Sequence, residues 1–196
     1  FRDCRFVGCS FRACALQGAL FQACTGFDPE TSAACDFSFA DLRDSRFERC
    51  DLTTAKFCRA RAYGAEFVGC NAQGADFSEL DASLGFGRDN AFAQIAFVQC
   101  NLAYADLSRV DLTACRLEGC RLVHAQLHET TLARANLRDC ELSNVEGRNL
   151  RLAGADLRGS TFNSFDPRVM DLSGIKITFE QSLMLLEPLE IWLYCS

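Results

Sequence analysis

A large apolar residue recurs at every fifth position of this sequence. The first frame of the repeat contains Phe1, Phe6, Phe11, Leu16 and Phe21. A second frame runs from Phe37 to Leu142 and resumes at Leu152, Leu157 and Phe162. A period of five fits neither an α-helix, which repeats every 3.6 residues, nor a β-strand, which repeats every two. A short repeat sustained over more than 100 residues instead predicts a solenoid.

A small residue precedes most of these central residues by two positions, and it is usually Ala or Cys. Ala fills this small position at Ala40, Ala55, Ala60, Ala65, Ala75, Ala105, Ala125, Ala135 and Ala155. Cys fills it at Cys4, Cys9, Cys14, Cys24, Cys35, Cys50, Cys70, Cys100, Cys115, Cys120 and Cys140. Free Cys behaves as a small, buried, apolar residue. We therefore expect reduced thiols in the core, with only Cys58 and Cys195 elsewhere, rather than disulfides. No C-x-x-C pair indicates a zinc site.

The period predicts a square coil. If each unit of five forms one side, four units close a turn of 20 residues, with the central and small residues inside. The outward positions agree with this arrangement, because they hold charged residues such as Arg43, Asp44, Arg138 and Asp139. Stacked coils would pair through their backbones at the ~4.8 Å spacing of neighbouring strands. We expect this rod over residues 1–175.

The first break in the period lies between Cys24 and Cys35. The stretch "TGFDPETSAA" replaces two units, and Pro29 within it favours a turn. We expect a loop over 27–34 that projects from the rod and places Phe27, Asp28 and Glu30 at its tip. As candidate partner-binding residues we select Phe27, Asp28, Pro29, Glu30 and Thr31. The alternative is an insertion that the fold tolerates without function.

The second break lies over residues 83–94, "SLGFGRDNAFAQ". The frame is kept across it, so we expect about twelve residues that leave the rod and return in register. Here the candidate partner-binding residues are Phe86, Arg88, Asp89 and Phe92. A weaker anomaly is Gly147, which stands where a central Leu belongs and would mark a kink.

The last segment, 176–196, loses the period. Residues 179–187 have apolar spacing typical of a helix, with Thr178 as its N-cap and Pro188 as its stop. This segment would cap the last coil or join two copies of the chain. The candidate dimer-interface residues are Leu186, Leu189, Ile191, Trp192, Leu193 and Tyr194.

The repeat units resemble those of pentapeptide-repeat proteins. Ala40-Asp41-Leu42, Ala75-Asp76-Phe77 and Ala135-Asn136-Leu137 match the family pattern A(D/N)LxX. The stretches "CDFSFADL", "CNAQGADF", "NLAYADLSRVDL" and "STFNSFDPR", together with both loops, resemble the quinolone-resistance (Qnr) members. The resemblance implies an all-β fold, a right-handed quadrilateral β-helix with two extruded loops and a short C-terminal helix.

The same resemblance implies a function. Proteins of this kind are cytoplasmic homodimers joined through their C-termini, and their rods are similar to duplex DNA in width and negative charge. They bind the type II topoisomerases DNA gyrase and topoisomerase IV and protect them from quinolones. The alternative is a pentapeptide-repeat immunity or scaffold protein with a different protein partner. Since residue 1 already lies inside the period and is not Met, we expect a trimmed or partly disordered N-terminus.

The sequence contains no recognisable catalytic constellation. The two histidines, His124 and His128, fall in outward positions on successive sides of the coil, and the carboxylates are spread along the rod. We therefore expect neither enzymatic activity nor a cofactor or metal. The net charge of −6 argues against a direct nucleic-acid partner, and no run of 18 apolar residues indicates a membrane span. An ice-binding surface would need arrays of outward Thr, which are absent from the sequence.

Overall fold

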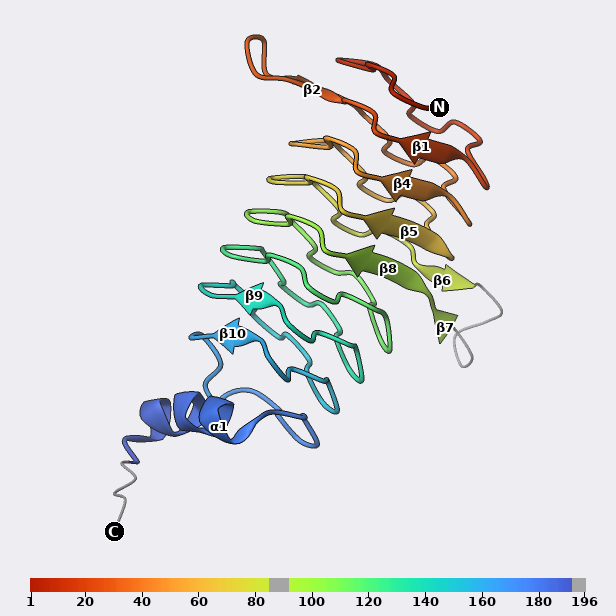
Figure 1. Cartoon of the computed structure of the whole chain (residues 1–196). Coiled ribbons are helices and arrows are strands. Elements are labelled where there is room, and N and C mark those ends of the chain that lie inside the picture. The colour runs from red at the N-terminus through yellow and green to blue at the C-terminus, as the bar shows by residue number, and fades with distance from the viewer. Residues whose placement is uncertain (85–91, 192–196) are drawn as a thin grey trace.

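The chain winds into a rod of stacked square coils, which confirms the predicted quadrilateral β-helix. The structure is a computed structural model, and it describes residues 1–84 and 92–191. The N-terminus lies at one end of the rod and α1 (Phe179–Leu186) lies at the other, as Figure 1 shows. The central residues Phe37, Leu42, Phe47 and Leu52 mark the four sides of one coil in chain order.

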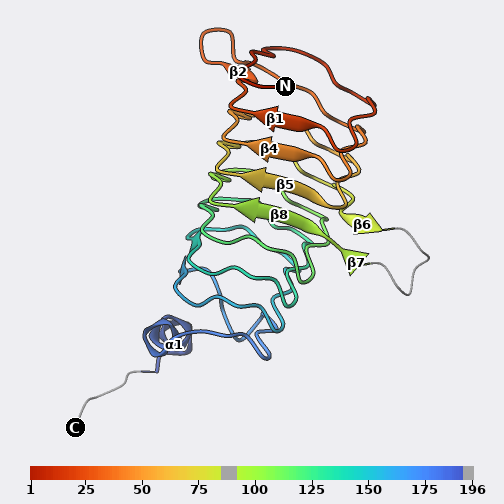
Figure 2. The same cartoon turned by 45° about the vertical axis from the view of Figure 1, so that its right-hand side comes forward.

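Parallel pairing holds successive coils in register. On the Phe47 side, β1 (Leu20–Gln22), β4 (Arg46–Glu48), β5 (Ala65–Val68) and β8 (Ile95–Val98) form one parallel sheet (Figure 2). On the Leu52 side, β9 (Glu141–Leu142) pairs with β10 (Thr161–Phe162). Elsewhere single bridges join residues 20 apart, such as Lys56 and Asp76. The predicted coil of four units is therefore correct.

Two additional hairpins interrupt the coils. The first consists of β2 (Phe27–Asp28) and β3 (Ala33–Ala34), and the second of β6 (Ser83–Leu84) and β7 (Phe92–Ala93). The step between paired residues grows from 20 to 26 at the first insertion, where Ala15 pairs with Asp41, and to 30 at the second, where Asp76 pairs with Asp106.

The Asp or Asn of each repeat unit builds the turn that follows it. The Asp76 carboxylate accepts the backbone N–H of Ser78 at 2.9 Å, and the Asn101 side chain accepts that of Ala103 at 3.2 Å. The next position along the unit then adopts a positive φ, as at Glu79 (55°) and Tyr104 (60°). A short side chain that caps a backbone N–H two residues later is the Asx motif. These carboxylates therefore stabilise the coil.

Two ladders of Phe rings fill the N-terminal half of the core. The rings of Phe21, Phe47, Phe67 and Phe97 stack on one side with centroids 4.7, 4.8 and 4.9 Å apart. Those of Phe37, Phe57 and Phe77 stack on the opposite side and meet the first ladder edge to face, for example at 5.5 Å between Phe57 and Phe67. The two remaining sides carry small central residues where the rings are most crowded, at Ala62, Ala72 and Ala82. Each coil therefore combines large and small inward side chains, and together they fill the core at close packing.

The fold compensates for Gly147 by exchanging large and small residues. Gly147 takes a central position, and Leu150 takes the small position that follows it and is buried there. A Cβ on Gly147 would lie 2.9 Å from the Leu150 side chain. The leucine therefore occupies the volume that a central side chain would need.

Most thiols are buried as predicted, but those of the first coil are not. Cys24, Cys35, Cys50, Cys70, Cys100, Cys115, Cys120 and Cys140 are buried, and every described Cys is free. Burial of Cys9 and Cys14 was a wrong expectation, since both are exposed, and Cys4 is half-buried. Their coil has a neighbouring coil on one side only. Cys58 is half-buried, and Cys195 lies outside the described residues.

The C-terminal segment forms α1 followed by a 3-10 helix over Glu187–Leu189. Thr178 is the N-cap as predicted, and it forms a capping box with Gln181. Pro188 lies within the 3-10 helix, so the α-helix ends at Leu186, one residue before the predicted end. In the described part of the chain, no helix combines the length and apolar character needed to cross a membrane.

Candidate protein-binding loops and C-terminal surface

The first candidate site is the β2–β3 hairpin near the N-terminal end of the rod. Phe27 pairs with Ala34 and Asp28 with Ala33, so both predicted contact residues lie at the hairpin base and are half-buried. The expectation that they occupy the tip was wrong. The Asp28 carboxylate accepts the Glu30 N–H at 3.1 Å and the Thr31 hydroxyl at 3.0 Å, which closes the turn. Pro29, Glu30 and Thr31 remain exposed at the tip.

The second candidate site is the larger loop between β6 and β7. Leu84 pairs with Phe92 and Ser83 with Ala93, and the Gln94 N–H then donates to the Ala82 carbonyl at 2.9 Å. The loop thus leaves and rejoins the same side of the rod. Of the predicted contact residues, Phe86, Arg88 and Asp89 lie outside the described residues, while Phe92 lies in β7.

Ile95 follows this loop in a small position, where sequence reasoning expected Ala or Cys, and it is buried. The bulkier side chain adjoins a surface pocket beside the base of the loop, which is lined by Gly64, Glu66, Gln94, Ile95, Ala114 and Arg116. This pocket is open to solvent, and Glu66, Gln94 and Arg116 supply the polar side chains of its lining.

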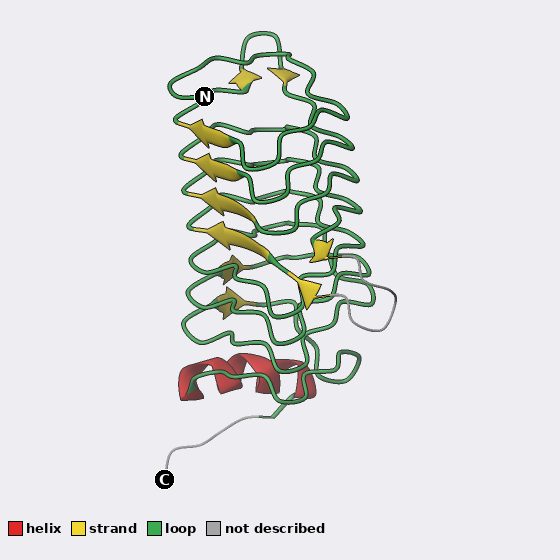
Figure 3. Ribbon diagram, turned by 90° about the vertical axis from the view of Figure 1, so that its right-hand side faces the viewer, coloured by secondary structure: helices red, strands yellow, loops and turns green. Residues whose placement is uncertain are grey.

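The two insertions project from diagonally opposite corners of the rod. The first follows Gly26, whose N–H donates to the Asp51 carbonyl on the Leu52 side, and the second follows Ala82 on the Leu42 side. Figures 1 and 2 show β2 and the strand pair β6–β7 on different sides of the rod axis. Figure 3 shows their offset along that axis. The offset is two and a half coils, or about 12 Å at the usual strand spacing.

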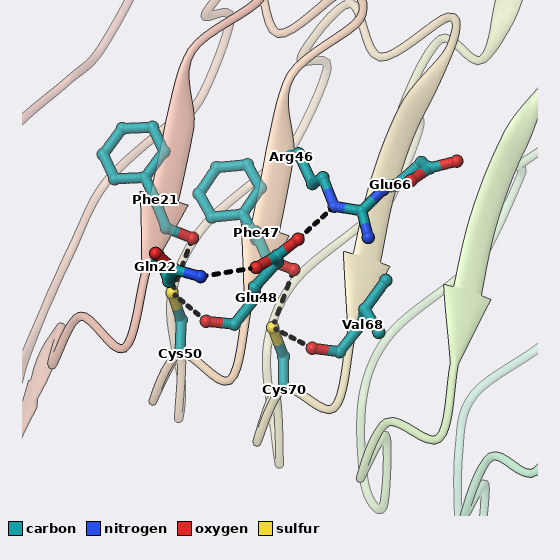
Figure 4. A network of polar contacts seen from close by, with 9 residues as sticks. All are labelled: Phe21, Gln22, Arg46, Phe47, Glu48, Cys50, Glu66, Val68 and Cys70. Atoms are coloured by element: carbon teal, nitrogen blue, oxygen red, sulfur yellow. Dashed lines mark hydrogen bonds and ion pairs between the residues drawn. The ribbon is translucent and has the colours of Figure 1, made fainter. Parts of the chain in front are cut away.

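Several charged side chains on the rod form ion pairs, some within one repeat unit and others between neighbouring coils. The Glu79 carboxylate lies 2.6 Å from Nε of Arg59 and 2.7 Å from a terminal guanidinium nitrogen of Arg109. These three residues come from three successive coils. Arg46 bridges Glu48 and Glu66, as Figure 4 shows. A hydrogen bond from Arg43 lowers the pKa of Asp41 to about 2. Paired charges of this kind weaken the negative potential that the rod presents to a partner.

A ladder of side-chain donors runs along one corner of the rod. The thiols of Cys50, Cys70, Cys100 and Cys120 each donate at 3.3 Å to the carbonyl of a central Phe in the preceding coil. Figure 4 shows the Cys50 thiol at the Phe21 carbonyl and the Cys70 thiol at the Phe47 carbonyl. Cys140 donates to Leu117 at 2.7 Å, and Ser160 donates to Leu137. Burial raises the pKa of Cys140 to about 11, which favours its protonated and less reactive form.

The C-terminal helix turns apolar residues toward solvent. Its single buried residue is the polar Gln181, while Phe179 is 73% exposed and Leu183 45% exposed. Of the predicted interface residues, Leu186 is half-buried, and Leu189 and Ile191 are exposed. Trp192, Leu193 and Tyr194 lie outside the described residues. Exposed apolar surface of this kind is typical of an interaction site.

The described residues contain no group of three or more His, Cys, Asp or Glu side chains that could hold a metal ion. His124 stacks against Tyr104 with ring centroids 5.1 Å apart. His128 accepts the Arg148 N–H through its Nδ1 at 3.2 Å. Both histidines therefore have structural contacts on the rod surface.

Comparison with known families identifies the class of protein. A model described as "Pentapeptide repeats (8 copies)" matches residues 35–71, and one described as "Pentapeptide repeat region" matches residues 90–166. Together with the square coil, these matches define a pentapeptide-repeat protein. No curated protein sequence matches the chain significantly.

Solved structures narrow the assignment. The structure of full-length QnrB1, a plasmid-mediated fluoroquinolone resistance protein, is 33% identical to this chain with a TM-score of 0.92, and the match covers 97% of this chain and 89% of QnrB1. A trypsin-treated QnrB1 variant matches at 30% identity and a TM-score of 0.88, over 100% of this chain and 98% of the variant. The chain therefore belongs to the Qnr family of pentapeptide-repeat proteins.

Proposed function

We propose that this protein binds the bacterial type II topoisomerases DNA gyrase and topoisomerase IV and protects them from quinolones. The observation that carries the proposal is the match to a fluoroquinolone resistance protein along 97% of the chain. The protein acts in the cytoplasm as a binding protein without catalytic activity. Protection of its target gives resistance to the drug.

The loops are the proposed contact surfaces, and the rod positions them. The exposed tip of the first hairpin, Pro29 to Thr31, combines a rigid apolar residue with a carboxylate and a hydroxyl. The larger loop adds Phe86, Arg88, Asp89 and Phe92, and an aromatic residue beside charged ones suits an interface anchor with a polar rim. Because many rod carboxylates are paired with arginines, recognition rests on the loops more than on overall negative charge.

A homodimer joined through the C-terminal segment is the proposed assembly. Phe179, Leu183 and Met184 on α1, together with Leu189 and Ile191, expose apolar surface at the end of the rod. A second copy of the chain would remove this surface from water, which is the main driving force for association. Light scattering of the full chain and of a variant that ends at residue 178 tests this assembly. A full chain that is monomeric at tens of micromolar would contradict it.

The test of function is gyrase supercoiling in the presence of a quinolone, with and without this protein. We expect the protein to restore supercoiling at drug concentrations that otherwise abolish it, while drug-free supercoiling is unchanged at the same protein concentration. Heat-denatured protein serves as the control for non-specific effects. If the drug inhibits gyrase and topoisomerase IV equally with and without folded protein, the proposal is wrong and the rod has another partner.

A further inference from the structure

The end of the rod poses a specific hydrogen-bonding problem. Inside the rod, the backbone carbonyl of each central residue on the Phe47 side accepts a hydrogen bond from a side chain of the next coil. For example, the Cys140 thiol donates to the Leu117 carbonyl. The backbone carbonyl of each small residue at the corner between the Phe47 and Leu52 sides accepts a hydrogen bond from a backbone N–H of the next coil. For example, the Thr161 N–H donates to the Cys140 carbonyl at 2.9 Å. In the last coil, Leu157 and Ser160 have no following coil at this corner to supply these donors.

The side-chain amide of Gln181 supplies both of them. Its Nε2 donates to the Leu157 carbonyl at 2.6 Å and to the Ser160 carbonyl at 2.6 Å. The first bond takes the place of the thiol or hydroxyl of a further coil, and the second takes the place of that coil's backbone N–H. The Gln181 Oε1 meanwhile accepts the Thr178 N–H at 2.7 Å, which ties the same amide to the start of α1.

Gln181 is 4% exposed, and it is the one buried residue of the helix. A buried amide whose donors all find acceptors contributes to stability, whereas buried carbonyls left unpaired by its removal are destabilising. Of the apolar residues of α1, Leu185 packs against the core, whereas Phe179 and Met184 are exposed. The orientation of α1 on the rod therefore rests on the polar contact of Gln181 together with the packing of Leu185.

We infer that Gln181 ends the coil ladder by imitating a further coil, and that it thereby positions α1 so that its apolar residues face a second copy of the chain. It is a positioning residue for the C-terminal interface. The part of the inference that concerns assembly rests on the proposed homodimer, whereas the docking of α1 on the rod stands independently of it.

The test compares Gln181→Met, which keeps the length of the side chain but removes both donors, with the full chain. Hydrogen exchange of residues 179–190 reports the docking of α1, and light scattering reports assembly. We expect exchange in this segment to be at least tenfold faster in the variant and self-association to be lost. Labelling of Cys100, buried in the middle of the rod, should stay as slow as in the full chain.

Two further variants sharpen the result. Gln181→Asn keeps the amide but shortens the side chain by one methylene, so the amide no longer reaches both carbonyls. Hydrogen exchange of residues 179–190 should therefore also be faster in this variant. Ser182→Ala is the matched control, because among the described residues the Ser182 hydroxyl donates to the Phe179 carbonyl within the helix, at 2.6 Å, and its loss should leave α1 docked.

The inference is overturned if Gln181→Met keeps the exchange protection of α1, or if it exposes Cys100 and so acts on the whole rod. A full chain that is monomeric refutes the proposed homodimer, and exchange of residues 179–190 then still decides whether Gln181 docks the helix.

Discussion

The rings of Phe47 and Phe67 stack with their centroids 4.8 Å apart and their planes within 3° of parallel. This distance equals the spacing of neighbouring strands in a sheet, so ring stacking and backbone pairing reinforce each other along the rod. Both residues are fully buried, and each also meets Phe57 edge to face.

Removal of one ring should therefore be costly. We expect Phe47→Ala to lower the free energy of unfolding by about 3–5 kcal/mol. The exposed neighbour Arg49 serves as control, and Arg49→Ala should change stability by no more than about 0.5 kcal/mol. Denaturant unfolding followed by circular dichroism measures both values, and equal losses would contradict the inward placement of the Phe ladder.

The thiols should react in two groups. Cys9 and Cys14 are exposed and should be labelled rapidly in the folded protein. Cys70 and Cys100 are buried, and hydrogen bonding to the neighbouring thiol of the next coil raises the pKa of each to about 12. Since the thiolate is the reactive form, these residues should be labelled only after denaturation. Mass spectrometry of labelled peptides measures the difference, and rapid native labelling of Cys100 would count against the core.

Two buried hydroxyls in small positions should behave oppositely when removed. The Thr130 hydroxyl donates to the Leu107 carbonyl at 2.8 Å, so Thr130→Val should cost about 1 kcal/mol. The Ser45 hydroxyl is buried without a hydrogen-bond partner among the described residues. Ser45→Ala should therefore leave stability unchanged or raise it. Thermal unfolding of both variants checks the pair, and a large loss for Ser45→Ala would reveal a partner for that hydroxyl.

Acid should weaken the rod through Asp41. The hydrogen bond from Arg43 holds the pKa of Asp41 at about 2 in the folded protein, below the ordinary value of about 3.9. A lowered folded-state pKa contributes stability that is present above about pH 4 and is lost as the pH falls toward 2. Melting temperatures measured between pH 5 and 2 should fall less steeply for Asp41→Asn than for the parent. An unchanged slope would mean that Asp41 is not linked to folding.

The five-residue period predicted the coil, the inward positions and the two interruptions because each repeat unit has the same local geometry. It also predicted Thr178 as a helix N-cap, since capping depends on a few adjacent residues. Relationships between coils were not visible. Leu150 compensates for Gly147 from the next unit, but the exchange becomes apparent only from packing, and Gln181 contacts carbonyls 21 and 24 residues earlier.

The first hairpin shows a second limit of sequence reasoning. Phe27 and Asp28 were expected at the tip because the break in the period begins beside them. Phe27 and Asp28 instead pair with Ala34 and Ala33 where the chain leaves the rod. This pairing places Phe27 and Asp28 at the base of the hairpin. The sequence gives no signal for this pairing. Ala is a weak strand former, and the paired segment is only two residues long.

The proposed contact between the larger loop and the topoisomerase can be tested by deletion of the loop. The coil that carries it has ten more residues than a regular coil, so deletion of residues 84–93 joins Ser83 to Gln94 and restores the 20-residue step. Circular dichroism and slow labelling of Cys100 would establish that the shortened rod is folded. Recognition by overall charge would survive this deletion and would weaken as salt screens it.

The most direct measurement is the concentration of this shortened rod that restores half of gyrase supercoiling in the presence of a quinolone. We predict that about tenfold more of it is needed than of the parent, which corresponds to about 1.4 kcal/mol of lost binding free energy. Equal protection by the shortened rod and the parent would contradict the account and would move the binding surface to the sides of the rod.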